Sequence, residues 1–434
     1  MKLLLAILAF NLIVIIHEFG HFIVAKLQGI RVYEFSLFMG PKIFSFERGG
    51  TMFSIRLIPM LAYVAFDKED SLYEDKSLGS HPVSARAAVI AAGPLFNIVS
   101  AAIALAIMFS LAGYQTMELS TVQKDTPAYE AGLKPGDRIV SFDHKRVYQP
   151  MEVDMFLYNV TKGSPVDMEV LRDGKIIPVK MTPRVIPENR PLIGFTAKII
   201  NGEPTNMIDN LEPGGPADKA GLKVNDIIVK LDNTEISNMQ QILNFMYKNT
   251  GESIQVTVLR DGKRLGPIEI KPKRGRNPQM FSTEMYYTFK QGNPMEILGQ
   301  SVTRTYSFTR IGLYSFAWLV QGKVPLNQMT GAVGAVDAIN TVVQQSTSIK
   351  DVIVYLLFMS ALISIGLGVT NLLPIPPADG SKLVLLAVEA IRRKPIPQEK
   401  EAFIMMAGFV FMMVLFVFTL YNDIARIIAR VFGG

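Results

Sequence analysis

Four apolar stretches in this chain are each long enough to cross the hydrocarbon core of a membrane as a helix. Crossing takes about 20 predominantly apolar residues, and the stretches cover residues 3–25, 86–113, 352–373 and 403–421. Few folds can hold such segments, because only helices and closed barrels satisfy all their backbone hydrogen bonds within lipid. We therefore expect a polytopic α-helical membrane protein with four transmembrane helices.

The first stretch could instead be a secretory signal peptide, since Lys2 precedes an apolar run. No small-residue cleavage site follows that run, and its apolar character continues past His21 to Ala25, unlike a cleaved signal. We expect it to be retained as the first span.

Composition narrows the class of function. The chain has 49% hydrophobic and 19% charged residues, and its net charge of +6 is common where cytoplasmic loops of membrane proteins carry extra Lys and Arg. No basic stretch with interleaved aromatic residues indicates nucleic-acid binding. The absence of cysteine excludes disulfides, thiol catalysis and Cys-ligated metal.

The region between the first two spans, residues 26–85, contains a β-rich segment. From Val32 to Phe66 apolar and polar residues alternate, with turn signals at Gly40-Pro41 and Gly49-Gly50, which predicts β-hairpins. Because membrane spans flank these apolar hairpins, we expect them to be membrane-associated.

An internal repeat occupies the region between the second and third spans. Residues 131–139 (AGLKPGDRI) return as residues 220–228 (AGLKVNDII), and residues 171–175 return as 259–263 at nearly the same offset. The repeated unit is therefore a whole small domain, and its pattern resembles the A-G-L-x-x-G-D-x-I signature of PDZ domains. We expect two inserted PDZ-like β-rich domains, at 114–190 and 191–275, and then a linker with amphipathic helices at 276–350.

The PDZ-like domains have two possible uses. PDZ domains bind extended peptides by strand addition, but the fold could also serve as a rigid plug that gates access of substrates. Asn225 replaces the glycine of the signature in the second copy, which indicates a turn not held to a strict peptide-binding form. This favours exclusion of bulky substrates over recruitment.

The sequence His17-Glu18-Phe19-Gly20-His21 lies within the first span. Two histidines at i and i+4 share one face of a helix, so both can reach one Zn²⁺. Glu18 is placed to take a proton from water at the metal, as the general base of a hydrolase. Ionisable side chains in a membrane helix are costly when unpaired and usually mark function, although a structural polar cluster between helices is the alternative.

Asp379 is the best candidate for a third ligand. It follows a segment with three prolines, residues 374–377, where a helix cannot continue. Unwound backbone at membrane depth is tolerated where it is buried in protein or lines a water-filled cavity. A helix cap is the alternative role for Asp379. His81 and His144 are poorer ligands, because one precedes the second span and the other belongs to a PDZ-like unit.

Span counting places the candidate ligands on one side of the membrane. His17 lies about 20 Å along the first span, past the middle of a roughly 30 Å core, and Asp379 follows the third span at its end on that side. The loop between the third and fourth spans is rich in basic residues, which is typical of the cytoplasmic side. These residues are Lys382, Arg392, Arg393, Lys394 and Lys400.

Together these features resemble the site-2 protease family of intramembrane zinc metalloproteases, closest to its bacterial sigma-E-regulating branch. The motifs are His-Glu-x-x-His in the first span, residues 93–97 (GPLFN) in the second, and Asn371-x-x-Pro374 leading to Asp379-Gly380 in the third. With residues 421–423 (YND) after the fourth span, the resemblance covers nearly the whole chain.

The resemblance implies a function and a location. His17, His21 and Asp379 would ligate zinc, Glu18 would activate water, and Asn371 would hold the substrate backbone. The protein would be a multi-pass protein of the bacterial inner membrane, with periplasmic PDZ domains and its active site towards the cytoplasm. Its substrates would be single-span membrane proteins, namely anti-sigma factors and remnant signal peptides.

Two positions depart from the family pattern. Ala378 stands where the family usually has leucine before the aspartate, and residues 61–64 (LAYV) stand where it has Gly-Gly-Tyr-Val. The candidate ligands are unaffected, so the departures concern how the hairpin meets a substrate.

Two other classes of function compete with the protease. A non-proteolytic membrane scaffold could bind peptides through its PDZ-like domains, but a purely structural metal site has no need of Glu18. A metal transporter would need several ionisable residues along a path through the spans, and away from the proposed site the spans offer too few.

Overall fold

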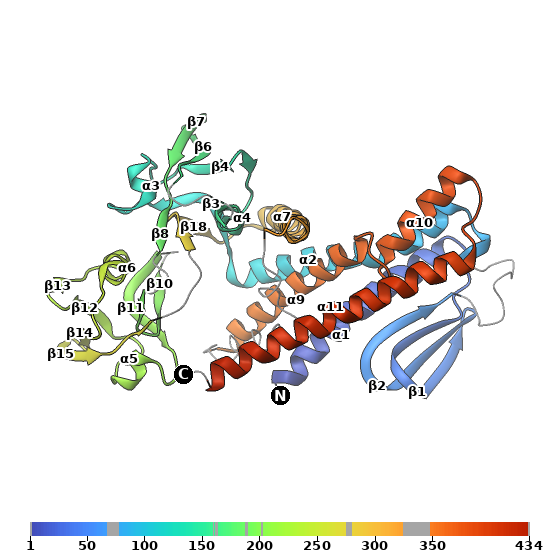
Figure 1. Cartoon of the computed structure of the whole chain (residues 1–434), viewed down its shortest axis with the longest axis horizontal. Helices are drawn as coiled ribbons and strands as arrows, with labels where there is room; N and C mark the ends of the chain where they lie inside the picture. Colours follow the sequence, from blue (N-terminus) through green and yellow to red (C-terminus); the bar gives the residue numbers. More distant parts are fainter. Residues whose placement is uncertain are drawn as a thin grey trace. The chain divides into compact units, whose positions relative to one another are not determined.

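The computed structural model describes residues 2–66, 78–158, 160, 164–186, 190–200, 203–274, 280–323 and 348–432. The chain forms two compact units (Figure 1). One combines Met1–Ala112 with Asn293–Gly434, and the other is Gly113–Gly292. The first is largely helical and the second is rich in β-strands.

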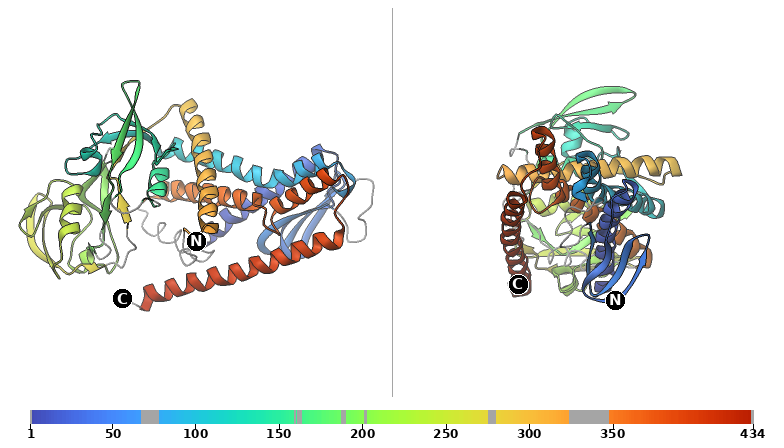
Figure 2. Two further views of the ribbon diagram at one scale, coloured as in Figure 1. Left: turned by 45° about the horizontal axis from the view of Figure 1, so that its top comes forward. Right: turned by 90° about the vertical axis from the view of Figure 1, so that its right-hand side faces the viewer.

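The four predicted spans are confirmed as helices. They are α1 (Lys2–Leu27), α2 (Val83–Ala112), α9 (Ile349–Leu372) and α11 (Gln398–Phe432). Each is long and apolar enough to cross a membrane. α10 (Asp379–Arg392) separates the last two, and α7 (Pro294–Val320) precedes them. Figure 2 shows α7 lying across α2 and α9, both of which it contacts.

α2 is the centre of the helical unit, because it packs against α1, α7, α9 and α10. Small residues allow two of these contacts to be close. A Cβ on Gly20 would lie 2.7 Å from the carbonyl oxygen of Ala92, and one on Gly368 would lie 2.9 Å from that of Pro94. α1 and α9 can therefore approach the backbone of α2 on either side of Gly93.

The predicted hairpins are present as two long strands, β1 (Glu34–Arg48) and β2 (Thr51–Ala65), which lie beside α1 (Figure 1). The start of β1 pairs with two different segments of β2, because Phe35 opposes both Phe53 and Val64. The strands thus form a small sheet in which residues 34–37 are interior. Among the described residues, 62–65 pair only with 34–37 and so form an edge. Many apolar side chains of the sheet are exposed, including Met39, Ile43, Phe44, Phe46, Ile55, Leu57, Ile58 and Leu61.

The second unit contains two six-stranded sheets of matching strand order. The first sheet has the order β18-β3-β4-β6-β7 with β5 on β4, and the second has the order β10-β11-β12-β14-β15 with β13 on β12. Two short ribbons, β8 with β17 and β9 with β16, lie between them in the sequence. The bounds of the first sheet's elements are β3 Tyr114–Thr121, α3 Pro127–Glu130, β4 Arg138–Phe142, β5 Lys145–Arg146, α4 Pro150–Leu157, β6 Val166–Arg172, β7 Lys175–Met181 and β18 Tyr286–Lys290. Those of the second are β10 Phe195–Ile200, β11 Glu203–Leu211, α5 Pro216–Lys219, β12 Ile227–Leu231, β13 Thr234–Glu235, α6 Met239–Lys248, β14 Ile254–Arg260 and β15 Lys263–Ile270. The ribbons are β8 Arg184–Ile186, β9 Pro191–Leu192, β16 Lys273–Arg274 and β17 Met280–Ser282.

β18 closes the first sheet from a distant part of the chain. It pairs with β3 and occupies the place that β10 occupies in the second sheet. Because β18 follows the second sheet in the sequence, the second domain is inserted into the first. β18 and α7 both lie within residues 276–350, and residues 276–279 and 324–347 of that segment are outside the described part of the chain.

The repeated sequence motifs meet in space as one ion pair in each domain, between a buried aspartate and a partly exposed arginine. Arg172 Nε donates to Asp137 Oδ1 over 2.6 Å, and in the second copy Arg260 Nε donates to Asp226 Oδ1 over 2.7 Å. Burial opposes ionisation of these carboxyl groups, but the arginine in each pair prevails and lowers the pKa of Asp137 and of Asp226. The pair ties the Ala-Gly-Leu turn to the Leu-Arg-Asp-Gly hairpin in each domain.

The expectation that Asn225 loosens its turn is wrong. Asn225 has φ +70°, in the same left-handed region as Gly136 at +87°. The turn hydrogen bonds also correspond, since Asn225 N donates to Ile208 O and Gly136 N donates to Leu119 O. Asparagine tolerates this backbone region better than most residues, so the turn keeps its form in both copies.

Candidate metal centre

His17 and His21 both project from α1 towards α2 and are buried, with exposed fractions of 7% and 8%. Their Nε2 atoms lie 3.2 Å apart. A Cβ on Gly93 of α2 would lie 2.3 Å from His21 Nε2 and 2.9 Å from His17 Cε1. Glycine at this position therefore makes room for the two rings.

Asp379 reaches the same point from the other end of the chain. α9 ends at Leu372, the proline-containing segment follows, and α10 begins at Asp379. Gly380 allows the turn to be tight, because a Cβ there would lie 2.3 Å from the carbonyl oxygens of Leu372 and Leu373. As a result, Asp379 Oδ2 lies 3.2 Å from His17 Nε2 and 3.4 Å from His21 Nε2.

These three atoms fit a zinc ion. With metal–ligand distances of about 2.0–2.1 Å, the ligands of a tetrahedral zinc lie about 3.3–3.4 Å apart, and the three separations here are 3.2, 3.2 and 3.4 Å. Two imidazoles and one carboxylate leave the fourth position open, as in catalytic zinc sites. Among the described residues, His17, His21 and Asp379 are the His, Cys, Asp or Glu side chains that lie close enough together to hold a metal ion.

The contacts behind His21 set its tautomer. His21 Nδ1 lies 2.8 Å from the carbonyl oxygen of Val89. A carbonyl only accepts, so Nδ1 carries the proton, and the lone pair of Nε2 faces Asp379 and the metal position. Second contacts of this kind are the rule for metal-binding histidines.

Asn97 stands behind His17 in the same way. Its side-chain amide nitrogen lies 3.2 Å from His17 Nδ1, the residue is fully buried, and its Oδ1 has no hydrogen-bond partner among the described residues. Turning the amide over, which leaves its shape unchanged, gives Oδ1 a donor in His17 Nδ1–H. The His17 Nε2 lone pair is then free for metal. Asn97 ends the motif at residues 93–97, but the sequence alone predicts no role for it. The sequence signal that could have indicated a role is an amide side chain within an apolar span.

Glu18 is half-buried beside the trio and is not one of the three converging ligands. Its carboxylate lies close to His17, His21 and Asp379, and close to the backbone N–H of Val64. Val64 belongs to the edge 62–65 of β2. The candidate base and this sheet edge are therefore neighbours.

The remaining predicted residues lie as follows. Asn371 is half-buried in the last turn of α9, shortly before Asp379 in the sequence. His81 is half-buried just before α2. His144 belongs to the other unit, where its side chain is 79% exposed and pairs with Asp167 over 3.5 Å.

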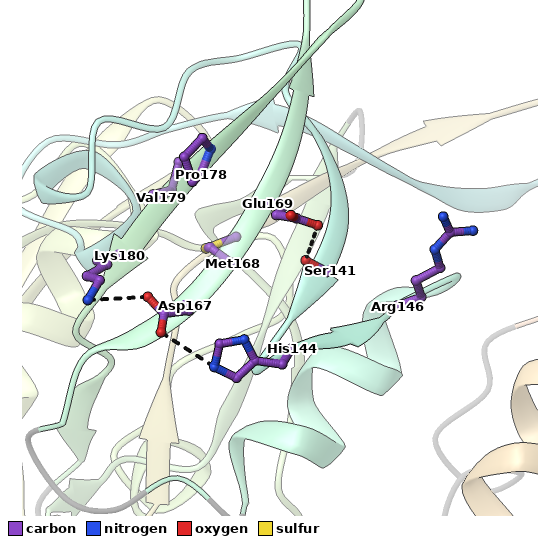
Figure 3. Close-up of a pocket in the computed structure, with 9 residues that line it drawn as sticks. All are labelled: Ser141, His144, Arg146, Asp167, Met168, Glu169, Pro178, Val179 and Lys180. Atoms are coloured by element: carbon purple, nitrogen blue, oxygen red, sulfur yellow. Dashed lines mark hydrogen bonds and ion pairs between the residues drawn. The ribbon is translucent and has the colours of Figure 1, made fainter.

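A hollow of about 710 Å³ surrounds His144 on the first sheet (Figure 3). Figure 3 shows Asp167 paired with His144 and Lys180, and the Ser141 hydroxyl bonded to Glu169. The hollow therefore lacks the three converging ligands that distinguish the centre on α1.

Comparison with known proteins gives a consistent picture. The profile described as Peptidase family M50 matches residues 5–415. The chain is 30% identical to "Regulator of sigma-W protease RasP" of Bacillus subtilis, with 97% of each chain covered. It is 28% identical to "Zinc metalloprotease RasP" of Oceanobacillus iheyensis, over 97% of this chain and 98% of that one. It is 26% identical to "Regulator of sigma-E protease RseP" of Escherichia coli, again over 97% and 98%.

Among solved structures, "HtrA-type protease AlgW with decapeptide" is 14% identical over 26% of this chain and 50% of that chain, with a TM-score of 0.20. This likeness is too weak to carry an argument.

Proposed function

This chain belongs to peptidase family M50 and is a zinc metalloprotease of the site-2 type, and from that premise we propose that it hydrolyses peptide bonds within transmembrane segments of single-span membrane proteins. The observation that carries the proposal is the meeting of His17, His21 and Asp379 at zinc-ligand separations. These ligands come from α1, one of the candidate spans, and from the segment that directly follows another.

Each residue of the centre has a proposed task. His17, His21 and Asp379 hold the zinc, which when bound supplies a Lewis acid that polarises the scissile carbonyl and acidifies water. Glu18 takes the proton of the attacking water and passes it to the leaving amine. Asn97 orients His17, and Asn371 holds the backbone of the substrate near the metal.

A substrate helix hides its scissile carbonyl in intrahelical hydrogen bonds, so it must unwind before it is cut. We propose that the unwound segment adds as a strand to the edge 62–65 of β2, which lies beside Glu18. Strand addition supplies main-chain hydrogen bonds whatever the side chains are. Helix-breaking residues in a substrate span should then accelerate cleavage.

The proposed location is the bacterial inner membrane, with the metal centre towards the cytoplasm. The basic residues of α10 and its connection to α11 support this orientation by the positive-inside rule. Two relatives are named as regulators of sigma-W and sigma-E. We accordingly propose membrane-bound anti-sigma factors as substrates, together with remnant signal peptides.

The PDZ-like unit is proposed to gate access to the spans from the periplasmic side. It comprises Gly113–Gly292 as one compact body, for which the size rule gives a radius of gyration of about 16 Å. A body of this size, joined to α2 at one end and to α7 at the other, would obstruct a bulky ectodomain and admit a short one. Recruitment of a peptide end to a PDZ-like groove is the competing form of gating.

The test is cleavage of a single-span model substrate by purified protein in detergent, with metal analysis of the same preparation. A zinc-containing protein that cuts within the span supports the proposal. Zinc-containing, folded protein that never cuts would instead support the scaffold, the reading that the relatives disfavour.

A further inference from the structure

The buried side-chain amide of Asn11 on α1 forms hydrogen bonds with β2 just before the free edge at residues 62–65. Asn11 is 4% exposed, and both ends of its side-chain amide bond the backbone of β2. Its Nδ2 donates to the carbonyl oxygen of Pro59 over 3.0 Å, and its Oδ1 accepts from Leu61 N over 3.1 Å.

The gripped backbone is in an unusual conformation. Leu61 has φ +67°, in the left-handed region that a leucine side chain disfavours. Glycine adopts that region freely, because it has no Cβ. The two hydrogen bonds from Asn11 therefore hold a conformation that Leu61 would not keep by itself.

The distance from Asn11 to Glu18 along α1 matches the distance from Leu61 to Val64 along β2. Asn11 and Glu18 are seven residues apart, so they lie on the same face of the helix, separated by about 10.5 Å. Leu61 and Val64 are three residues apart, which spans about 10 Å in a strand. One end of this stretch is bonded to Asn11 and the other faces Glu18.

We propose that Asn11 is a positioning residue that sets the register of strand 61–65 against Glu18 and the metal centre. A slip of one residue would turn every side chain and backbone group of the strand to the other side. A substrate strand added to a slipped edge would present a different peptide bond to the metal. This inference rests on the proposed docking of substrate at that edge.

The first test follows the backbone itself. Asn11→Leu preserves approximate volume and removes both hydrogen bonds, so amide exchange of the segment 59–65 should accelerate at least tenfold in the full-length protein. Zinc content should not change, because Asn11 touches no ligand. Lys26→Met is the matched control. It removes another hydrogen bond from α1 to this sheet, from Lys26 Nζ to Gly49 O, and should leave exchange of 59–65 unchanged.

The second test follows the products. Wild type should cut a single-span substrate at one bond, whereas Asn11→Leu should cut it at least tenfold more slowly and at several neighbouring bonds. Adding Leu61→Gly to Asn11→Leu should restore the single site and most of the rate, since glycine adopts the left-handed conformation without help. A packing defect in α1 would not be repaired by a change at Leu61. Asn11→Ala serves in the same way if the leucine variant does not fold.

Unchanged exchange of 59–65 in Asn11→Leu would overturn the inference, and so would accelerated exchange with an unchanged cleavage site and rate. A loss of activity that Leu61→Gly fails to repair would also overturn it. If wild type itself does not cleave, the proposed function fails, while the exchange experiment still decides whether Asn11 holds the strand.

Discussion

Asp379 Oδ2 lies 3.2 Å from His17 Nε2, although almost the entire chain separates the two residues. The contact joins the first residue of α10 to the middle of α1. It completes a trio whose separations match those of zinc ligands. The geometry of the candidate metal centre therefore depends on how accurately α9 and the segment after it pack against α1 and α2.

The first prediction concerns metal content. We expect one zinc ion per chain, lost in His21→Ala because a ligand is removed, and bound more weakly in Asp379→Ala, which keeps two of the three ligands. Elemental analysis of purified protein measures this. Replacing His81 with alanine is the control and should leave zinc content unchanged. Stoichiometric zinc in a protein lacking both His17 and His21 would refute the assignment.

The second prediction separates catalysis from metal binding. Glu18→Gln keeps the shape of the side chain and removes the base, so cleavage of a single-span substrate should fall by at least a hundredfold. Zinc content and thermal stability should stay close to those of wild type. Activity within tenfold of wild type would show that Glu18 is not the base.

The third prediction tests the contact behind His17. Asn97→Leu removes the partner of His17 Nδ1 and should weaken zinc affinity about 10–100-fold, as measured by competition with a chelator. Ser100→Ala is the matched control, because Ser100 lies on the same helix and bonds Ser364 instead of a ligand. Equal zinc affinities for the two variants would remove Asn97 from the metal centre.

The fourth prediction uses the ion pair of Arg172 with the buried Asp137 in the first β-rich domain. Because the folded-state pKa of Asp137 is below the unfolded value of about 3.9, the pair stabilises the domain above about pH 4. That contribution is lost as the pH falls through the lowered folded-state pKa. Arg172→Met leaves the buried carboxylate of Asp137 without its partner, so it should lower the free energy of unfolding by about 3 kcal/mol at pH 7. The difference in unfolding free energy from wild type should shrink below pH 4.

Urea-dependent hydrogen exchange of the β4 and β6 amides in the full-length protein measures this free energy. Lys180→Met is the control. It breaks a pair with the half-exposed Asp167 and should cost less than about 1 kcal/mol. A constant difference between Arg172→Met and wild type from pH 7 to pH 3 would contradict the role of the Asp137 charge.

The fifth prediction concerns gating, and the strand order determines how to test it. Removing residues 122–271 would leave β3 and β18 without the rest of their sheet. The ribbon of β9 with β16 brings the two ends of the second domain together, so residues 193–272 can be replaced by a short linker. Under exclusion, this variant should cut long-ectodomain substrates that wild type spares. Under recruitment, it should cut short substrates more slowly. Unchanged dependence on ectodomain length in the folded variant would argue against exclusion.

Several features of the fold could be predicted because their signals are local. The four spans follow from apolar length, and the hairpins follow from alternation and glycine turns. The repeat of the two domains follows from two short motifs. The left-handed turn at Asn225 was misjudged, because asparagine can occupy the backbone region of the glycine it replaces and so preserves the hydrogen bonds of the turn.

Other features depend on pairing between distant segments, which no local pattern encodes. β18 closes the first sheet from beyond the second domain, and a five-residue strand within an expected linker carries no sign of its partner. Asn11 and Asn97 are single amides in apolar helices. Their sequence neighbours do not reveal that one meets the backbone at Leu61 and the other meets His17.

By itself, the sequence determined which side chains are candidates for the chemistry. Helical spacing places His17 and His21 on one face with Glu18 between them, and the prolines before Asp379 end a helix, because both effects act within a few residues. Only the tertiary structure decided that Asp379 comes within 3.4 Å of both histidines, that Gly93 leaves room for their rings, and that the edge of β2 lies beside Glu18. Those relations arise from the packing of helices and a sheet that are far apart in the chain, and packing depends on the shapes of all the surfaces that meet.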